Sequence, residues 1–184
     1  MRRPGKPVSP KTVPYMSLID LGALSDFELS GDESGLIQRV HALRKKLLRD
    51  FLPHEVRLCV GQGIGLPYVV PRALDILSRD PWVETEYYAG DLLHACIDVE
   101  RSYWHEHPEQ RDSMRSILRL AAAAATPERQ DIGRQERRDL EHGLKKFEVS
   151  TEPGAEWRPG GAAGRFGGQW RAAIGELSVR CQSL

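Results

Sequence analysis

The chain lacks several features that would place it in a specialised class of protein. It has no apolar run approaching the roughly 18 residues of a membrane helix, and no apolar block follows the basic residues at its start. It has only three cysteines, an odd number without paired spacing, at Cys59, Cys96 and Cys181. We therefore expect a soluble cytoplasmic protein with reduced thiols, no export signal, no disulfide framework and no membrane partner.

The chain also lacks a net charge, because 26 basic residues balance 26 acidic ones. The charges are nevertheless unevenly distributed. Range 75–112 holds ten acidic and three basic residues, which gives it a net charge of −7. Such a segment repels nucleic acid and attracts a basic protein. We expect a protein partner and no nucleic acid.

Convincing strand patterns are missing as well, and 56–60 is the closest approach to one. Apolar residues instead recur at spacings of three and four, the pattern of amphipathic helices. With 184 residues, 40% of them hydrophobic, the chain is long enough for one domain with appendages. The predicted fold is an all-α, compact multi-helix bundle. The expected helices span about 36–51, 53–60, 66–79, 92–97, 108–125 and 127–147.

Two prolines complicate the helix expected at 66–79. Pro67 suits a first helical turn, but Pro71 cannot donate a hydrogen bond to the carbonyl of Pro67. The helix therefore either begins near Val70 or has a distorted first turn. We expect it to end at Asp80, which precedes a proline and so avoids helical geometry.

Composition divides the chain into four segments. Residues 1–16 contain four prolines and are expected to form a mobile leader without regular structure. A helical domain is predicted over 17–125, followed by a charged helix within 126–149. Residues 150–184 are rich in glycine and arginine and are expected to be disordered, apart from a short helix at about 170–179.

A glycine-rich turn, GQGIG at 61–65, follows the apolar run 56–60. A dinucleotide-binding loop needs a further glycine where Leu66 stands, and a phosphate loop needs a Gly-Lys-Ser/Thr ending that is absent here. Pro67 and Pro71 also remove amide donors that a phosphate would need. We interpret the segment as a tight turn between helices and expect no cofactor.

Histidines between 94 and 107 do not form a recognisable metal site. His94 and Cys96 are two apart on an expected helix, so their side chains diverge and cannot easily bind one metal. His105 and His107 have no partner pair elsewhere in the chain. We therefore expect surface histidines and no bound metal.

Acidic and aromatic residues are interleaved around the expected loop after Pro81. Acid–base catalysis by Glu84, Glu86 and Asp91 would require them to converge in one pocket, and a solvated acidic loop is the simpler interpretation. A small bundle also needs aromatic volume in its core, and we place Trp104 and Tyr88 there. The other aromatic residues are predicted to form a surface for a basic partner: Trp82, Tyr87 and Tyr103.

Two sequence blocks stand out within residues 34–110: GQxIGL at 61–66 and YxGDLL at 88–93. Together they resemble the bacterial contact-dependent growth inhibition (CDI) immunity proteins, and their joint occurrence at this separation is fairly specific. Gly63 and Pro67 depart from the family pattern, where polar residues are expected. Further matching positions are 43–46 (LRKK), Arg57, Leu58, Val70, Pro71, Ala73, Leu74, Leu77, Pro81 and Trp104.

The resemblance implies a small cytoplasmic protein that binds and blocks the C-terminal toxin domain delivered by a neighbouring cell. Such toxins are often nucleases, whose basic clefts would suit the acidic range 75–112. We expect occlusion of the toxin's active site and no catalytic residue in this chain. The predicted partner-binding residues are Glu84, Glu86, Tyr87 and Asp91, extended by Asp98 and Glu100.

Two functions of other classes remain open. A helical DNA-binding regulator would use 56–60, the glycine turn and 66–78 as a helix-turn-helix. The outward residues of its second helix make a poor recognition surface: Arg72, Asp75 and Arg79. A small metal-dependent hydrolase would instead use His94, His105 and His107.

Overall fold

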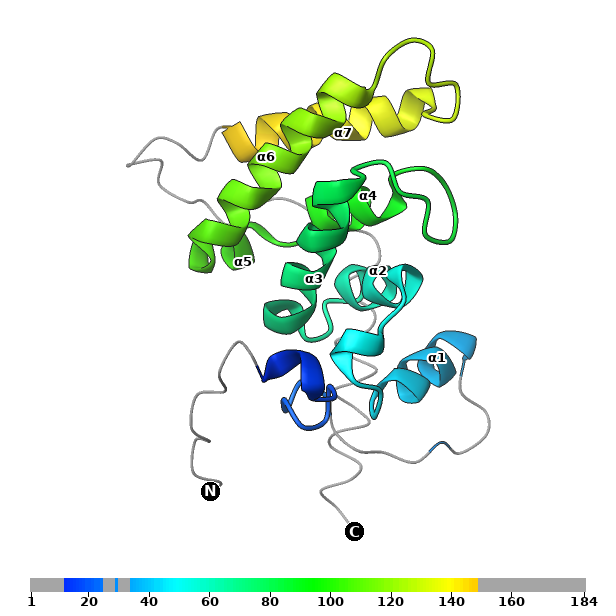
Figure 1. The fold of residues 1–184 in the computed structure, drawn as a ribbon, viewed down its shortest axis with the longest axis vertical. Coiled ribbons are helices and arrows are strands. Elements are labelled where there is room, and N and C mark those ends of the chain that lie inside the picture. The colour runs from blue at the N-terminus through cyan, green and yellow to red at the C-terminus, as the bar shows by residue number, and fades with distance from the viewer. Residues whose placement is uncertain (1–11, 25–28, 30–33, 149–184) are drawn as a thin grey trace.

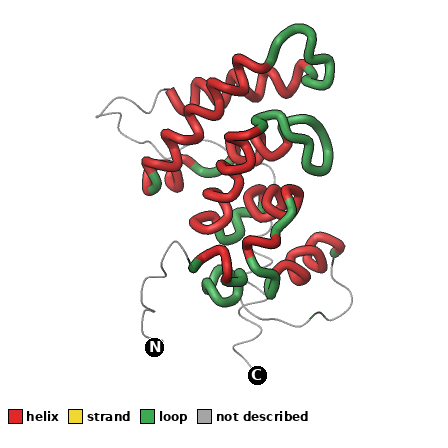
Figure 2. The backbone as a smooth tube through the Cα atoms, viewed as in Figure 1, coloured by secondary structure: helices red, strands yellow, loops and turns green. Residues whose placement is uncertain are grey.

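The computed structural model describes residues 12–24, 29 and 34–148, and the tail predicted at 150–184 lies outside these residues. Within the described residues every regular element is a helix (Figure 2). The only strand-like contacts there are two isolated bridges, Ser17 with Leu47 and Glu84 with Ala89. The all-α prediction is confirmed.

Seven α-helices and two short 3-10 helices follow one another along the described part of the chain. In chain order they are η1 (Val13–Tyr15), α1 (Gly35–Leu43), η2 (Leu48–Asp50), α2 (Pro53–Gly61), α3 (Leu66–Arg79), α4 (Asp91–Asp98), α5 (Arg101–Glu106), α6 (Pro108–Ala124) and α7 (Arg134–Glu148).

The helices are stacked along the long axis of the molecule, with α1 toward one end and the pair α6 and α7 at the other (Figure 1). Helices α2, α3 and α4 pack together between these ends, and α6 and α7 close over α3 and α4. The inward side chains form one hydrophobic cluster. Its members with no exposed surface include Val56, Val70, Leu92, Met114 and Leu118.

The glycine turn joins α2 to α3, as the sequence predicts. Gly63 and Gly65 adopt the left-handed conformation, with φ of 68° and 60°, which glycine adopts without the steric cost of a side chain. A Cβ on Gly65 would also lie 3.0 Å from Cδ2 of Leu18. The turn therefore lets α2 pack against α3 and leaves room for Leu18 beside Gly65.

Helix α3 contains Pro71 and begins at Leu66, so a start near Val70 is wrong. The amides of Tyr68 and Val69 both donate to the carbonyl of Gly65, which forms the first turn. Pro71 deprives only one carbonyl of its partner, and that carbonyl lies near the exposed start of the helix, where water can replace the bond. The predicted apolar stripe is buried at Val69, Val70, Ala73, Leu74 and Leu77.

The single helix predicted over 36–51 is wrong, because α1 ends early and η2 follows. The intervening main chain pairs with an earlier segment: the amide of Leu48 donates to Met16 O at 3.1 Å, and that of Ile19 donates to Arg44 O at 3.2 Å. A continuous helix would use the amide of Leu48 and the carbonyl of Arg44 internally. The tertiary pairing therefore replaces the helix.

The charged helix also begins later than predicted, at Arg134. The residues before it form a loop whose carbonyl groups bind one guanidinium. Arg137 donates to the carbonyl oxygens of Ala125, Thr126, Arg129 and Ile132. Ile132 is also buried beneath this loop at 4% exposure. These contacts outweigh the local helix-start signal of Thr-Pro-Glu at 126–128.

Two short elements have no counterpart in the sequence prediction. The 3-10 turn η1 lies within the leader that was expected to lack regular structure, so that expectation is wrong for this turn. Residues 1–11 of the leader lie outside the described residues. Helix α5 turns Tyr103 and Trp104 into the core. The short helix predicted at 92–97 and the helix predicted at 108–125 are present as α4 and α6.

Candidate partner-binding surface

The loop between α3 and α4 is built around the carboxylate of Asp91, whose side chain has no exposed surface. One carboxylate oxygen accepts from the amide of Thr85 at 3.0 Å, and the other accepts from the amides of Glu86 and Tyr87 at 3.0 and 3.1 Å. The hydroxyl of Thr85 adds a fourth donor at 2.8 Å. Charge-assisted bonds of this kind offset the cost of burying the carboxylate and hold the loop in one conformation.

The base of the same loop is held by Trp82 and Gly90. Trp82 is buried, and its indole nitrogen donates to the carbonyl of Ala121 in α6 at 2.9 Å. Gly90 caps α4 with a φ of 86°, and its α-carbon faces the Trp82 ring so closely that a Cβ would lie 2.7 Å from Cε3. The amide of Gly90 donates to Val83 O at 3.1 Å and closes the loop.

Two arginines from earlier helices hold the outer side of the loop. Arg39 of α1 binds Glu86 through two bonds of 2.9 and 3.0 Å. The hydrogen bond from Arg39 lowers the pKa of Glu86, and the same bond raises the pKa of Arg39. The guanidinium of Arg57 in α2 lies 4.4 Å from the ring centroid of Tyr87 and 3.5 Å, through Nε, from Asp91. Tyr87 nevertheless stays 57% exposed.

The predicted partner-binding residues therefore occupy three different environments. Glu84, Glu86 and Tyr87 lie at the surface of the loop. Asp91 is buried and acts on the loop from inside. Asp98, whose side chain is 74% exposed, lies at the opposite end of α4, about 10 Å along the helix axis from Asp91. Glu100 lies just beyond it, so these two acids belong to a separate part of the surface.

The aromatic residues are distributed differently from the prediction. Trp104 is buried, as predicted, but Tyr88 remains partly exposed and contacts His94 Nδ1 through its hydroxyl at 2.7 Å. The prediction that Trp82 and Tyr103 lie on the partner surface is wrong, because both are buried, at 3% and 8% exposure. They fill the core because α6 packs over them, so only Tyr87 remains as an exposed aromatic residue of the loop.

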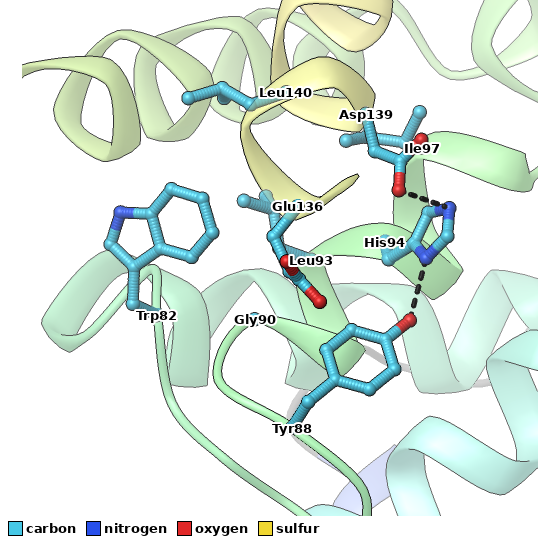
Figure 3. Close-up of a pocket in the computed structure, with 9 residues that line it drawn as sticks. All are labelled: Trp82, Tyr88, Gly90, Leu93, His94, Ile97, Glu136, Asp139 and Leu140. Carbon is cyan, nitrogen blue, oxygen red and sulfur yellow. Dashed lines mark hydrogen bonds and ion pairs between the residues drawn. The ribbon is translucent and has the colours of Figure 1, made fainter. Parts of the chain in front are cut away.

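A shallow depression separates the loop from α7 (Figure 3). His94 lies at its edge between the hydroxyl of Tyr88 and Asp139, whose carboxylate is 3.6 Å from Nε2. The described residues contain no group of three His, Cys, Asp or Glu side chains arranged to hold a metal ion. His107 instead stacks on Tyr103 at 4.2 Å between ring centroids. The histidines proposed for a hydrolase therefore do not form a metal site here.

The two cysteines that the structure describes are buried free thiols. Burial raises the pKa of Cys59 to about 12, and it has the same effect on Cys96. Thiols of this kind are unreactive. Cys181 lies outside the described residues.

The helix-turn-helix arrangement of α2 and α3 exists, but its second helix is poorly suited to DNA. Arg72 and Arg79 both pair with Asp75, at 3.5 and 2.9 Å, on the exposed face of α3. The carboxylate of Asp75 between these two arginines reduces the positive charge that the helix would offer to DNA phosphate. Within the described residues, no helix is long and apolar enough to cross a membrane.

Sequence reasoning missed the two arginines that organise the loop. Arg39 is 47 residues from Glu86 in the chain, and no spacing pattern links them. In the sequence, Arg57 is marked only as a position that matches the CDI immunity proteins. The signal that could have found Arg57 is its place on α2 beside the buried stripe, with no acid three or four residues away on that helix.

A helical scaffold that presents a rigid loop with an exposed aromatic ring has the features of a protein-binding module. The model of the family of CDI immunity proteins matches residues 23–114, which is half of the chain. The chain therefore belongs to the CDI immunity protein family, whose members neutralise a CDI toxin. The matched range contains α1 to α5 and the whole loop. No curated protein and no solved structure matches the chain.

Proposed function

We propose that this immunity protein binds its toxin domain in the cytoplasm through the loop surface, which we define as Glu84, Glu86 and Tyr87 with Arg39 and Arg57. The observation that carries the proposal is the ordering of this loop before binding. Asp91 fixes its main chain, and Arg57 restrains the exposed ring of Tyr87. A surface that is already ordered loses little conformational entropy when a partner binds.

The loop surface holds two acidic and two basic residues, so the attraction of a basic partner depends on Glu84 and on the acids around this surface. Glu84 is exposed, whereas Glu86 is paired with Arg39 and its charge is largely neutralised. Asp98 and Glu100 add negative charge on a neighbouring part of the surface, where they would attract the partner over a longer range. A nuclease has a basic cleft for its substrate, and covering that cleft would inhibit it without any catalytic step in this chain.

The proposed surface is tested by the kinetics of binding to the cognate toxin domain. Glu84→Lys is expected to slow association about tenfold at low salt, and the difference should shrink at high salt because exposed charges are then screened. Tyr87→Ala is expected to speed dissociation about thirtyfold, as for a central aromatic anchor. Glu86→Gln is expected to slow association less than Glu84→Lys, because glutamine can still accept a hydrogen bond from Arg39.

Glu109→Lys is the matched control, because Glu109 is exposed on α6 and the substitution changes the net charge equally. If Glu84→Lys and Tyr87→Ala bind with wild-type rates at every salt concentration, this surface is excluded. Toxin activity is measured in the same series with and without excess substrate. Inhibition that excess substrate does not relieve would contradict occlusion of the active site, while survival on co-expression tests neutralisation itself.

A further inference from the structure

A small cavity lies between α5, the start of α6 and the end of α7, and it shares no residue with the loop surface. Its volume, measured as the space open to the centre of a water molecule, is about 20 Å³. About 10–15 Å³ is enough for one water molecule, so the cavity has room for one oxygen atom of a ligand, and its open mouth leaves space for the rest of a small group. Its lining residues are Arg101, Trp104, His105, Arg111, Lys146 and Phe147.

Two buried hydrogen-bond donors, on residues that line this cavity, have no acceptor. They are the indole nitrogen of Trp104, a residue only 3% exposed, and Nε of Arg111. Among the described side chains only three buried polar atoms lack a partner, and these are two of them. The Trp104 ring is held edge to face by Tyr103 and Phe147, at 5.3 and 5.2 Å between centroids. Buried donors are nearly always bonded, so an acceptor is expected here.

The side chains around these donors are positively charged. Arg101, Arg111 and Lys146 line the cavity with His105, and none of the described residues in its lining is acidic. The ammonium of Lys146 donates to the carbonyls of Ile97 and Val99, which leaves one of its three donors unused.

The nearest acids are directed elsewhere. Asp112 lies 3.8 Å from Nε of Arg111, but its side chain is 62% exposed and it binds Arg115 at 2.9 Å. Asp98 acts on Lys146 only through its charge, from a side chain that is 74% exposed. Burial lowers the pKa of Lys146, and a bound anion would oppose that effect.

We infer that this cavity binds one small oxyanion, a carboxylate or phosphate group, which accepts from Trp104 Nε1 and Arg111 Nε and is held by the charge of Arg101. The group can come from a free anion or from an acidic side chain of a bound protein, since the chemistry is the same. The inference does not depend on the proposed toxin surface, because none of its residues belongs to that surface.

The test follows the indole N–H resonances of the 15N-labelled full chain during titration with sodium phosphate or, separately, sodium acetate. Sodium chloride at equal ionic strength is the reference. The resonance of Trp104 is expected to shift and to saturate, whereas that of Trp82 should stay in place because it already donates to Ala121 O. Trp104→Phe and Trp82→Phe assign the two signals. Comparing the affinities from the phosphate and acetate titrations shows which type of oxyanion binds.

Arg101→Gln is expected to weaken binding about fivefold, the effect of removing one partly screened charge at contact distance. Arg119→Gln is the matched control, since Arg119 is an exposed arginine of α6 outside the cavity, and it should leave the affinity unchanged. The inference is overturned if Trp104 does not shift or shifts without saturating. An equal loss of affinity in both arginine variants, or an equal response to chloride, would also overturn it.

Discussion

Replacing Asp91 by alanine is expected to lower the free energy of unfolding by about 3–5 kcal/mol. The substitution removes a buried acceptor and leaves three loop amides and the Thr85 hydroxyl without their partner. It also leaves Arg57 Nε, which is buried, without its nearest charge. Urea unfolding measures the loss, and hydrogen exchange should show that Thr85, Glu86 and Tyr87 lose protection.

Asp98→Ala is the matched control, because Asp98 is on the same helix with a side chain that is 74% exposed. Its expected change is within about 0.5 kcal/mol, as for most surface substitutions. Asp91→Asn should fall between the two, since an amide keeps the volume but turns a donor toward the loop amides. Equal stability of Asp91→Ala and Asp98→Ala, or unchanged exchange of the loop amides, would refute the role given to Asp91.

If the loop surface is the toxin-binding site, Asp91→Ala should also weaken toxin binding although Asp91 touches no partner. The loop would then have to be ordered during association, and this cost lowers affinity. The effect separates from global instability at temperatures far below the unfolding transition, where the variant is fully folded. Wild-type affinity in a folded Asp91→Ala variant would show that the order of the loop is irrelevant to binding.

Replacing Gly90 by alanine is the second change with a large expected effect, a loss of about 2–4 kcal/mol in the free energy of unfolding. Two costs combine at this position. The φ of 86° is strained for any residue with a side chain, and the new Cβ would lie 2.7 Å from Cε3 of Trp82. Trp82 cannot retreat easily, because its ring is buried and its indole nitrogen is bonded to Ala121 O.

Alanine substitutions at two other glycines separate the backbone cost from the steric cost when the free energy of unfolding is measured in the same way. Gly63 has a φ of 68° but nothing within 4 Å of an added Cβ, so Gly63→Ala should lose only the backbone contribution of about 1–2 kcal/mol. Gly61 has open space and no positive φ, and Gly61→Ala should be neutral or slightly stabilising at the end of α2. A Gly90→Ala loss no larger than that of Gly63→Ala would show that Trp82 yields to the new methyl group.

The elements that the sequence predicted best are those whose signals are local and strong. The stripe of α3 from Val69 to Leu77 is wide, and an Asp-Pro pair ends that helix, so its buried face and its end followed from neighbouring residues alone, whereas Pro71 left its start open. The errors at 36–51 and 126–133 have the opposite cause. At 36–51 the main chain binds Met16 and Ile19, which lie outside the local pattern. At 126–133 the side chain of Arg137 binds main-chain carbonyls of the loop, a contact that helical periodicity does not indicate.

The candidate site shows the same division. The sequence located the acidic loop and singled out Glu84, Glu86 and Tyr87, which lie at its surface. It also placed Trp82 and Tyr103 at the surface. Their burial depends on Ala121 and Gln110 of α6, a helix distant in the sequence that closes over them. The sequence did not indicate the role of Asp91 either, because a carboxylate in an acidic segment is expected to be exposed to water. Only the structure shows three loop amides donating to it.

The sequence by itself determined the helical class, the turn between α2 and α3 and the blocks that this chain shares with the CDI immunity proteins. These depend on periodicity, on glycine and proline conformation and on residue identity, all of which are local. Only the tertiary structure decided which acids are exposed, which aromatic residues are buried, and that Arg39 and Arg57 hold the loop. Burial and charge pairing depend on residues brought together from distant parts of the chain, and no spacing within a single segment records them.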